Sequence, residues 1–267
     1  MLCGICVMWS SAAFAQTPSP LAEWQYAGGV ALEPYFETAV PVWQVQLGAG
    51  AGVQPRYEGS ARYHAQPEPL IEIRYRDIGF FSLGEGLGVN FLSRKGLRAG
   101  AALSYDLGRR EELDPRLHGL GNISPAPELK FFGEYVLYPV VLRADVRRAF
   151  GGHSGLIGDL SVYLPLLGSE KFFVLAGPTV TLVNNEYAQR YFGITPAQSA
   201  ASGLPVYGAA GGIKDVSLGI TAAWLFGEHW SVDGIAATER MLGDASRSPL
   251  VETPLQYTLS VYLAYSF

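Results

Sequence analysis

Hydrophobic and polar residues alternate one for one along most of the chain. From Leu255 to Phe267 every second residue is apolar or aromatic, and the residues between them are small or polar except Tyr262. Because successive side chains of a β-strand point to opposite faces, this pattern predicts strands with one apolar and one polar face. Further strands are expected at 43–53, 70–76, 80–91, 97–107, 129–138, 140–147, 156–166, 171–183, 215–226 and 229–239.

Two all-β architectures produce such alternation, a soluble sandwich and a transmembrane barrel. Sandwich strands average about 5 to 6 residues, whereas strands that span a bilayer need about 9 to 11, and most segments here reach the longer figure. Aromatic residues lie near many strand ends, as in the interfacial girdles of outer-membrane barrels. They include Phe80, Phe81, Phe131, Phe132, Tyr138, Phe172, Phe173, Trp230 and Phe267. The pattern predicts a single antiparallel, up-and-down transmembrane β-barrel.

The connections predict how this barrel is threaded. Eleven segments alternate clearly, and since bacterial single-chain barrels have an even number of strands, residues 24–32 are expected to supply a twelfth; merging weak segments would give ten. The long connections 108–127 and 184–212 are expected outside the cell, and the short turns 93–96, 138–139 and 168–171 in the periplasm.

The N-terminal residues have the features of an export signal. An apolar run is followed by Ala13-Phe14-Ala15, which has the form of a signal-peptidase site. Residues 1–15 are therefore expected to be removed, residues 16–41 to form an N-terminal segment that possibly includes the first strand, and residues 42–267 to form the barrel. Cys3 and Cys6 both fall in the signal, so the mature chain would contain no thiol.

Composition narrows the class further. Only 16% of the residues are charged, against about 25% in soluble domains, and the net charge of −5 offers no footprint for nucleic acid. No uninterrupted apolar run of about 18 residues exists, which excludes a bundle of transmembrane helices.

Charged residues occupy the polar phase of the predicted strands and are expected to line the lumen. In one interpretation they pair across strands and fill a narrow barrel; in the other they border a water-filled constriction that selects ions or small solutes. The candidates are Arg74, Glu85, Arg98, Lys130, Glu134, Arg143, Asp145, Arg147, Asp159, Asp215 and Asp233.

Catalytic and cofactor signals are weak. His153, Ser154 and Asp159 lie close in sequence, but the first two belong to a Gly-rich hairpin loop without a nucleophile elbow. No two histidines have metal-ligand spacing, and the glycines of 84–88 are expected within a strand rather than in a nucleotide-binding loop. We expect no enzyme, no metal and no cofactor.

Several loop segments resemble the MltA-interacting protein / OmpV family of outer-membrane proteins. They are Pro55–Ser60, Leu117–Gly121, residues 191–207 and Arg240–Val251, and the resemblance runs from about residue 42 to Phe267. It implies a barrel in outer-membrane lipid, inserted by the barrel-assembly machinery, for which Leu263, Tyr265 and Phe267 are the expected signal. It also implies a scaffold that binds a murein-degrading lytic transglycosylase and a penicillin-binding protein.

Two other functions stay open at this stage. The charged lumen suggests a small-solute or ion channel of the outer membrane. The family also contains surface proteins described as adhesive, and the long loop 184–212 carries Tyr187, Tyr191, Phe192 and Tyr207 as candidates for surface binding.

Overall fold

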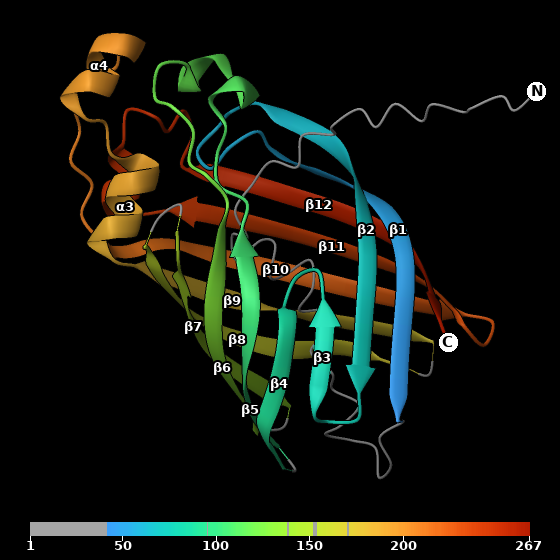
Figure 1. The fold of residues 1–267 in the computed structure, drawn as a ribbon. Helices are drawn as coiled ribbons and strands as arrows, with labels where there is room; N and C mark the ends of the chain where they lie inside the picture. Colours follow the sequence, from blue (N-terminus) through green and yellow to red (C-terminus); the bar gives the residue numbers. More distant parts are fainter. Residues whose placement is uncertain (1–41, 95, 138, 152–153, 170) are drawn as a thin grey trace, which may run out of the picture.

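The computed structural model is a closed barrel of twelve antiparallel strands, described for residues 42–267 except 95, 138, 152–153 and 170. Each strand pairs with its neighbours in sequence, and β1 pairs with β12 to close the ring (Figure 1). The strands are β1 Trp43–Pro55, β2 Tyr63–Tyr75, β3 Gly79–Ser82, β4 Gly86–Arg94, β5 Leu97–Asp106, β6 Ala126–Leu137, β7 Val140–Ala149, β8 Leu156–Gly168, β9 Phe172–Val183, β10 Gly212–Phe226, β11 Trp230–Met241 and β12 Leu255–Ser266. The predicted all-β barrel is confirmed.

The twelfth strand comes from a different place than predicted. Residues 80–91 do not form one strand, because the chain reverses between Ser82 and Gly86 and gives the short strand β3 and the strand β4. Gly86 has φ +88, and a side chain there would meet the carbonyl oxygen of Leu103 at 2.1 Å, so only glycine suits this turn. Gly84 therefore lies in a turn, contrary to the expectation of one continuous strand, whereas Gly86 and Gly88 lie within strand β4 as expected. Residues 24–32 and the predicted signal lie outside the described residues.

Strand β2 begins earlier than the alternation indicated. The sequence predicts a strand from residue 70, but β2 starts at Tyr63 and includes Pro67 and Pro69, each of which lacks a backbone donor. The neighbouring strand β3 ends at Ser82, opposite Glu72, so among the described strands these prolines interrupt no hydrogen bond on that side.

The two ends of the barrel differ. At one end, the turn end, short turns join the strands, and β1 begins and β12 ends there. At the other, the loop end, the long connections 107–125 and 184–211 agree with the predicted loops to within two residues. They fold into 3₁₀ turns η1 (Glu111–Leu113) and η2 (Pro115–Leu117) and helices α3 (Asn185–Phe192) and α4 (Pro196–Ser202).

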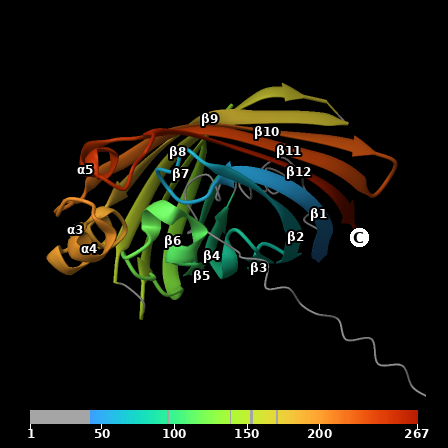
Figure 2. The same ribbon diagram turned by 90° about the horizontal axis from the view of Figure 1, so that it is seen from above.

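A third helix, α5 (Gly243–Arg247), joins these elements at the loop end, and Figures 1 and 2 place the helices together there. Among the described residues, no helix has the length and apolar character required to cross a membrane.

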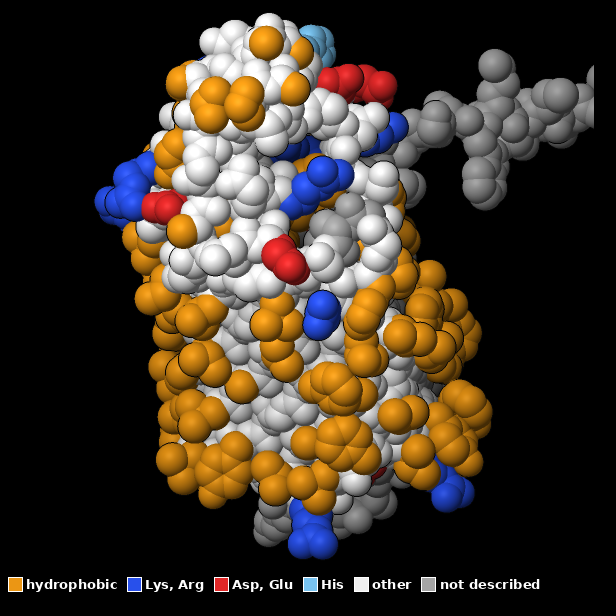
Figure 3. Space-filling model, turned by 60° about the vertical axis from the view of Figure 1, so that its left-hand side comes forward, with side chains coloured by type: hydrophobic (Ala, Val, Ile, Leu, Met, Phe, Trp, Pro, Cys, Tyr) orange, Lys and Arg blue, Asp and Glu red, His pale blue; other side chains and the backbone are white. Residues whose placement is uncertain are grey.

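The barrel is apolar outside and polar inside. The outward residues of β12 are Leu255, Tyr257, Leu259, Val261 and Leu263, all exposed, whereas the inward residues between them, such as Thr258 and Ser260, are buried. Figure 3 shows hydrophobic side chains over the strands and a largely polar surface at the loop end. This arrangement is the one required when lipid surrounds the strands.

Some strand glycines allow neighbouring strands to approach closely, so alanine should be tolerated at some glycine positions and not at others. In β9, a Cβ on Gly177 would lie 1.7 Å from the carbonyl oxygen of Val162, whereas Gly133 in β6 has no atom within 4 Å of that position. We expect Gly177→Ala to lower the free energy of unfolding by about 1–3 kcal/mol through overpacking, and Gly133→Ala to change it by less than about 0.5 kcal/mol. Urea unfolding in lipid vesicles, followed by tryptophan fluorescence, measures both; equal midpoints for the two variants would contradict the β8–β9 register.

Candidate functional site

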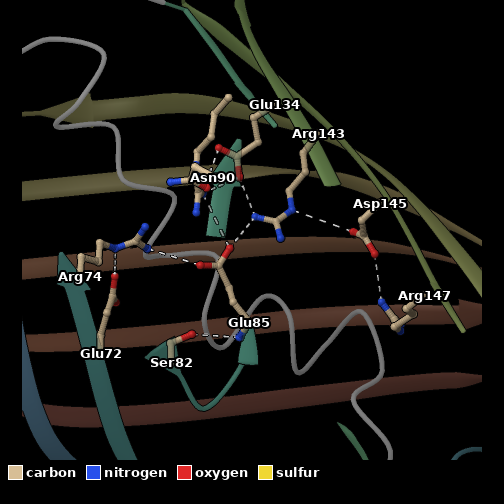
Figure 4. Close-up of polar contacts among 10 residues, drawn as sticks. Glu72, Arg74, Ser82, Glu85, Asn90, Glu134, Arg143, Asp145 and Arg147 are labelled. Atoms are coloured by element: carbon tan, nitrogen blue, oxygen red, sulfur yellow. Dashed lines mark hydrogen bonds and ion pairs between the residues drawn. The ribbon is translucent and has the colours of Figure 1, made fainter. Parts of the chain in front are cut away.

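A network of arginines and carboxylates fills the lumen beside the β3–β4 turn (Figure 4). Arg143 on β7 donates from Nη1 to Glu134 on β6 at 2.7 Å and to Glu85 in the turn at 3.0 Å. Arg98 on β5 donates to Glu134 at 3.2 Å, and Arg74 on β2 lies 3.5 Å from Glu85. The turn that breaks the predicted strand thus places the Glu85 carboxylate where arginines from three strands meet.

A second group of charges continues along the lumen from the first. Arg147, four residues beyond Arg143 on the same face of β7, donates to Asp159 on β8 at 2.7 Å and to Asp145 at 3.3 Å. It also lies 3.8 Å from Glu128 on β6, and Asp145 lies 3.9 Å from Arg143. The alternation of β7 therefore stacks two arginines that bind carboxylates of three strands.

Two aromatic rings support the network from within the lumen. Phe80 and Phe132 meet edge to face with centroids 5.7 Å apart, and the Arg98 guanidinium lies 5.0 Å from the first ring and 4.8 Å from the second. Such cation–π contacts hold the guanidinium in place. The expectation that both residues belong to interfacial girdles was wrong: Phe80 and Phe132 are buried in the lumen, and only Phe81 and Phe131 face outward.

A third cluster lies near the loop end and contains residues that the sequence analysis missed. Lys214 contacts Glu58, lies 2.7 Å from Asp215 and lies 4.0 Å from Glu239. Strict alternation would point only one of Lys214 and Asp215 inward, but the β9–β10 register shifts between Ile213 and Asp215, and both side chains are buried. A bulge of this kind leaves no signal in an alternating pattern.

This third cluster also contains the one group of possible metal ligands among the described residues. Carboxylate oxygens of Glu58, Asp215 and Glu239 lie within 4.8 Å of one another. The ammonium group of Lys214 contacts two of these carboxylates, so a protein cation already supplies positive charge between them. We therefore describe it as an ion-pair cluster.

The predicted lumen residues all lie on the inner side of the wall. Ten of the eleven are buried, and Asp233 is half-buried and accepts a hydrogen bond from Ser231 at 3.0 Å. Other buried charges were not predicted, and all of them except Lys214, which the bulge turns inward, share the polar phase. These are Glu68, Asp106, Glu128, Lys214 and Glu239.

The loops at the loop end form a folded cap. The rings of Tyr187 and Tyr191 stack at 4.4 Å, and the Tyr191 hydroxyl donates to Asp106, with both carboxylate oxygens within 2.8 Å. Arg109 donates to the Tyr191 carbonyl at 2.6 Å. Burial raises the pKa of Tyr187, the nearby Glu58 and Asp106 raise it further, and burial lowers the pKa of Arg109. Tyr187, Tyr191 and Phe192 are buried and do not form an exposed binding surface.

Several of the loop segments that carried the family resemblance meet in this cap. Tyr57, Leu117, Leu120, Ile194 and Leu250 pack together in one apolar cluster. The Tyr57 hydroxyl donates to the Leu250 carbonyl at 2.9 Å, and burial raises its pKa. Motifs far apart in the sequence are therefore parts of one packed structure.

Comparison with known families places most of the chain in one family. A family model described as "MltA-interacting protein MipA" matches residues 47–267. The chain belongs to the MipA family. It is an outer-membrane β-barrel, as the sequence predicted. No curated protein matches the chain.

Solved outer-membrane proteins share a general similarity with this MipA-family chain. OmpT of Vibrio cholerae is 8% identical with a TM-score of 0.39, over 84% of this chain and 97% of its own. Salmonella typhi OmpF, in complex with daunomycin, is 10% identical with a TM-score of 0.41, over 84% and 97%. A bacterial polysaccharide outer-membrane secretin is 9% identical with a TM-score of 0.42, over 86% and 99%.

The residues considered for catalysis are engaged elsewhere in this MipA-family barrel. Ser154 donates to Glu186 at 3.0 Å, and Asp159 is buried against Arg147. His153 lies outside the described residues. The described geometry therefore shows no Ser–Asp relay.

In this MipA-family protein, the hydrogen bond between Tyr191 and Asp106 is expected to keep the cap closed. Tyr191→Phe removes the hydroxyl that donates to the buried Asp106, a charged hydrogen bond worth about 1.5–3 kcal/mol. We expect trypsin to cleave after the exposed Arg190 at least about ten-fold faster in membrane vesicles, because the cap opens more often. Tyr257→Phe, on the exposed face of β12, is the matched control. Equal cleavage rates in the two variants would rule out this role for the Tyr191 hydroxyl.

Proposed function

We propose that this barrel is a non-enzymatic scaffold that holds a murein-degrading lytic transglycosylase at the inner surface of the outer membrane. The observation that carries the proposal is the match to the MltA-interacting protein family over residues 47–267. A penicillin-binding protein is a second candidate partner of the same scaffold.

The turn end is the surface we assign to docking. Outer-membrane barrels have short periplasmic turns and longer outer loops, which assigns the turn end to the periplasm, where murein lies. Exposed basic residues gather on the described turns, namely Arg76, Arg94 and Lys171, while Glu228 is an exposed acid there. Such a surface favours an acidic face on the partner and accelerates encounter with it.

The two alternatives receive less support from the geometry. The arginines of the lumen lie within ion-pair distance of carboxylates, which supports a filled barrel rather than a selective constriction. The surface-binding alternative relied on loop aromatics, three of which are buried in the cap.

Photo-crosslinking in intact outer membranes tests the scaffold. A photoreactive amino acid at Lys171 or Glu228, on the turn end, is expected to capture the lytic transglycosylase. The same group at Ala200, exposed on α4 at the loop end, is the control and is expected to capture none. Equal recovery from both ends, or recovery from neither, would contradict docking at the turn end.

Charge reversal supplies a quantitative prediction for the same surface. Replacing Arg76, Arg94 and Lys171 together by Glu is expected to weaken binding of the purified transglycosylase about ten-fold or more at low salt, and less as salt rises. Arg247→Glu changes an exposed arginine at the loop end and is expected to leave the Kd unchanged. Surface plasmon resonance at two salt concentrations measures both; a salt-independent loss would point to misfolding instead.

A further inference from the structure

The outer faces of the described strands carry few charged side chains, and all of these are arginines. At the outward positions of the twelve strands the charged residues are Arg94, Arg148 and Arg240, and every carboxylate of these strands belongs to the inward set. On the face seen in Figure 3, basic side chains lie at the margins of the hydrophobic wall rather than across its middle. The outer wall therefore combines an apolar band with positive charge at its margins.

Two of these arginines occupy equivalent places at the loop end. Arg148 is the last residue but one of β7, Arg240 is the last but one of β11, and both strands end at the loop end. Their register partners on the outer face are all apolar. These are Leu129 and Leu156 beside Arg148, and Val216 and Leu255 beside Arg240. Each arginine therefore marks the point where the apolar band meets the polar cap.

The surroundings of Arg148 show what kind of molecule fits. Its guanidinium lies 6.0 Å from the ring of Phe150, which is 49% exposed, and the neighbouring Leu156 is 41% exposed. Arg148 is itself exposed. A ligand that covers this surface must offer an anionic or acceptor group to the guanidinium and apolar groups to the two hydrophobic side chains.

Arg240 has the same combination of neighbours. It is exposed, and Leu255 and Val216 on the adjoining strands are 40% and 37% exposed. Tyr257, the next outward residue of β12, is 54% exposed. Both arginines therefore join a positive charge to an accessible apolar surface.

The physical chemistry of the membrane selects the anion. An outward arginine is strongly unfavourable at the middle of the bilayer, but the cost falls close to zero near the interface, where the side chain extends to the head groups. Anionic head groups attract basic side chains at this depth. The planar guanidinium can donate two parallel N–H bonds to a phosphate, which explains why arginine suits this place better than lysine.

The spacing of the two arginines favours lipid over a protein as the occupant. Strands β8, β9 and β10 lie between β7 and β11, so four strand spacings of about 4.8 Å separate the two positions, about 19 Å in all. A protein interface would gather its charges in one patch. Lipid surrounds the barrel on every side and can meet each arginine separately.

We propose that Arg148 and Arg240 each bind the phosphate group of a lipid in the outer leaflet. The guanidinium donates to the phosphate oxygens, and the acyl chains lie against Phe150 and Leu156 at one site and against Leu255 at the other. The leaflet is the outer one because the loop end, with its long connections, faces outward. This inference goes beyond the scaffold function, which uses the opposite end of the barrel.

Two lipids that differ in head-group charge test the proposal. The full chain is reconstituted in vesicles that contain diazirine-labelled phosphatidate, whose phosphate is a free monoester, or the matching phosphatidylcholine, whose phosphate is capped by choline. After irradiation at low salt, mass spectrometry locates the label. We expect about five-fold more labelling of residues 146–156 and 236–242 by phosphatidate, with a smaller preference as salt rises. Residues 160–164, in the middle of β8, should be labelled equally by both lipids. Equal labelling of 146–156 and 236–242 by the two lipids would overturn the proposal.

Single substitutions separate the two sites, and each variant is the matched control of the other. Arg148→Met is expected to abolish the phosphatidate preference at residues 146–156 and to retain it at 236–242. Arg240→Met is expected to do the reverse, although both variants remove one exposed positive charge from the loop end of a strand. A preference that survives at the substituted site, or one that disappears from both sites in either variant, would refute two separate phosphate sites.

Discussion

Lys214→Met is expected to destabilise the barrel by about 3–5 kcal/mol, because it removes the cation from a buried cluster of three carboxylates. Lys214 is 2% exposed, so water cannot replace its charge. Without the lysine, the carboxylates of Glu58, Asp215 and Glu239 repel one another, and protonating one of them removes this repulsion. The folded variant therefore takes up protons more readily than the unfolded chain, in which these groups are far apart. Its loss of stability should therefore be largest at neutral pH and shrink as the pH falls toward 4. Urea unfolding in vesicles at pH 4.5 and 7.5 measures both effects.

Two further variants control this result. Lys171→Met removes an exposed lysine at the turn end and is expected to change the unfolding free energy by less than about 0.5 kcal/mol. Adding Glu239→Gln to Lys214→Met lowers the buried negative charge and should recover part of the stability at neutral pH. An unfolding midpoint for Lys214→Met that does not depend on pH would show that the carboxylates are not held charged beside the lysine.

Arg147→Met is expected to cost a similar amount, about 3–5 kcal/mol, through the lumen network. Arg147 is 2% exposed and lies against Asp159, Asp145 and Glu128. The substitution would leave these three buried carboxylates without the guanidinium. The next residue, Arg148, supplies a matched control. Arg148 has the same side chain on the same strand, faces outward, and contacts the Phe150 ring at 6.0 Å.

Arg148→Met should therefore change the unfolding free energy by less than about 0.5 kcal/mol. The difference between the two variants measures what the lumen position contributes, with residue type and strand held constant. Equal losses would contradict the inward assignment of Arg147 and with it the register of β7.

The strands themselves could be predicted from the sequence because lipid outside and polar groups inside impose a strict period of two. That period placed β5, β9 and β12 to within a residue or two. It failed where the backbone departs from regular pleating. The β3–β4 turn depends on the positive φ of Gly86, and β2 can include Pro67 and Pro69 because the short strand β3 pairs only with residues 72–75 of β2.

The site was predictable in part for the same reason. The alternation of β7 was enough to place Arg143 and Arg147 inside, because both occupy polar positions of that strand. It could not show that Lys214 and Asp215 are both inside, since a bulge shifts the register between them. It could not show that Tyr191 is buried either, because the cap joins loops that are distant in sequence, and Asp106 and Tyr191 are 85 residues apart.

The central claim is that the twelve described strands close the barrel by themselves, through the seam at which β1 pairs with β12. With Cys3 and Cys6 replaced by Ser, cysteines at Ala49 and Leu263 would face each other across this seam, since the two residues are register partners. The control pair, Ala49 with Leu259, is displaced by four residues, about 13 Å along the strand, which exceeds the reach of a disulfide. We predict a disulfide-linked peptide from the first pair and none from the second after oxidation in outer membranes. Free thiols in the first pair, or a disulfide in the second, would contradict the closed twelve-strand barrel.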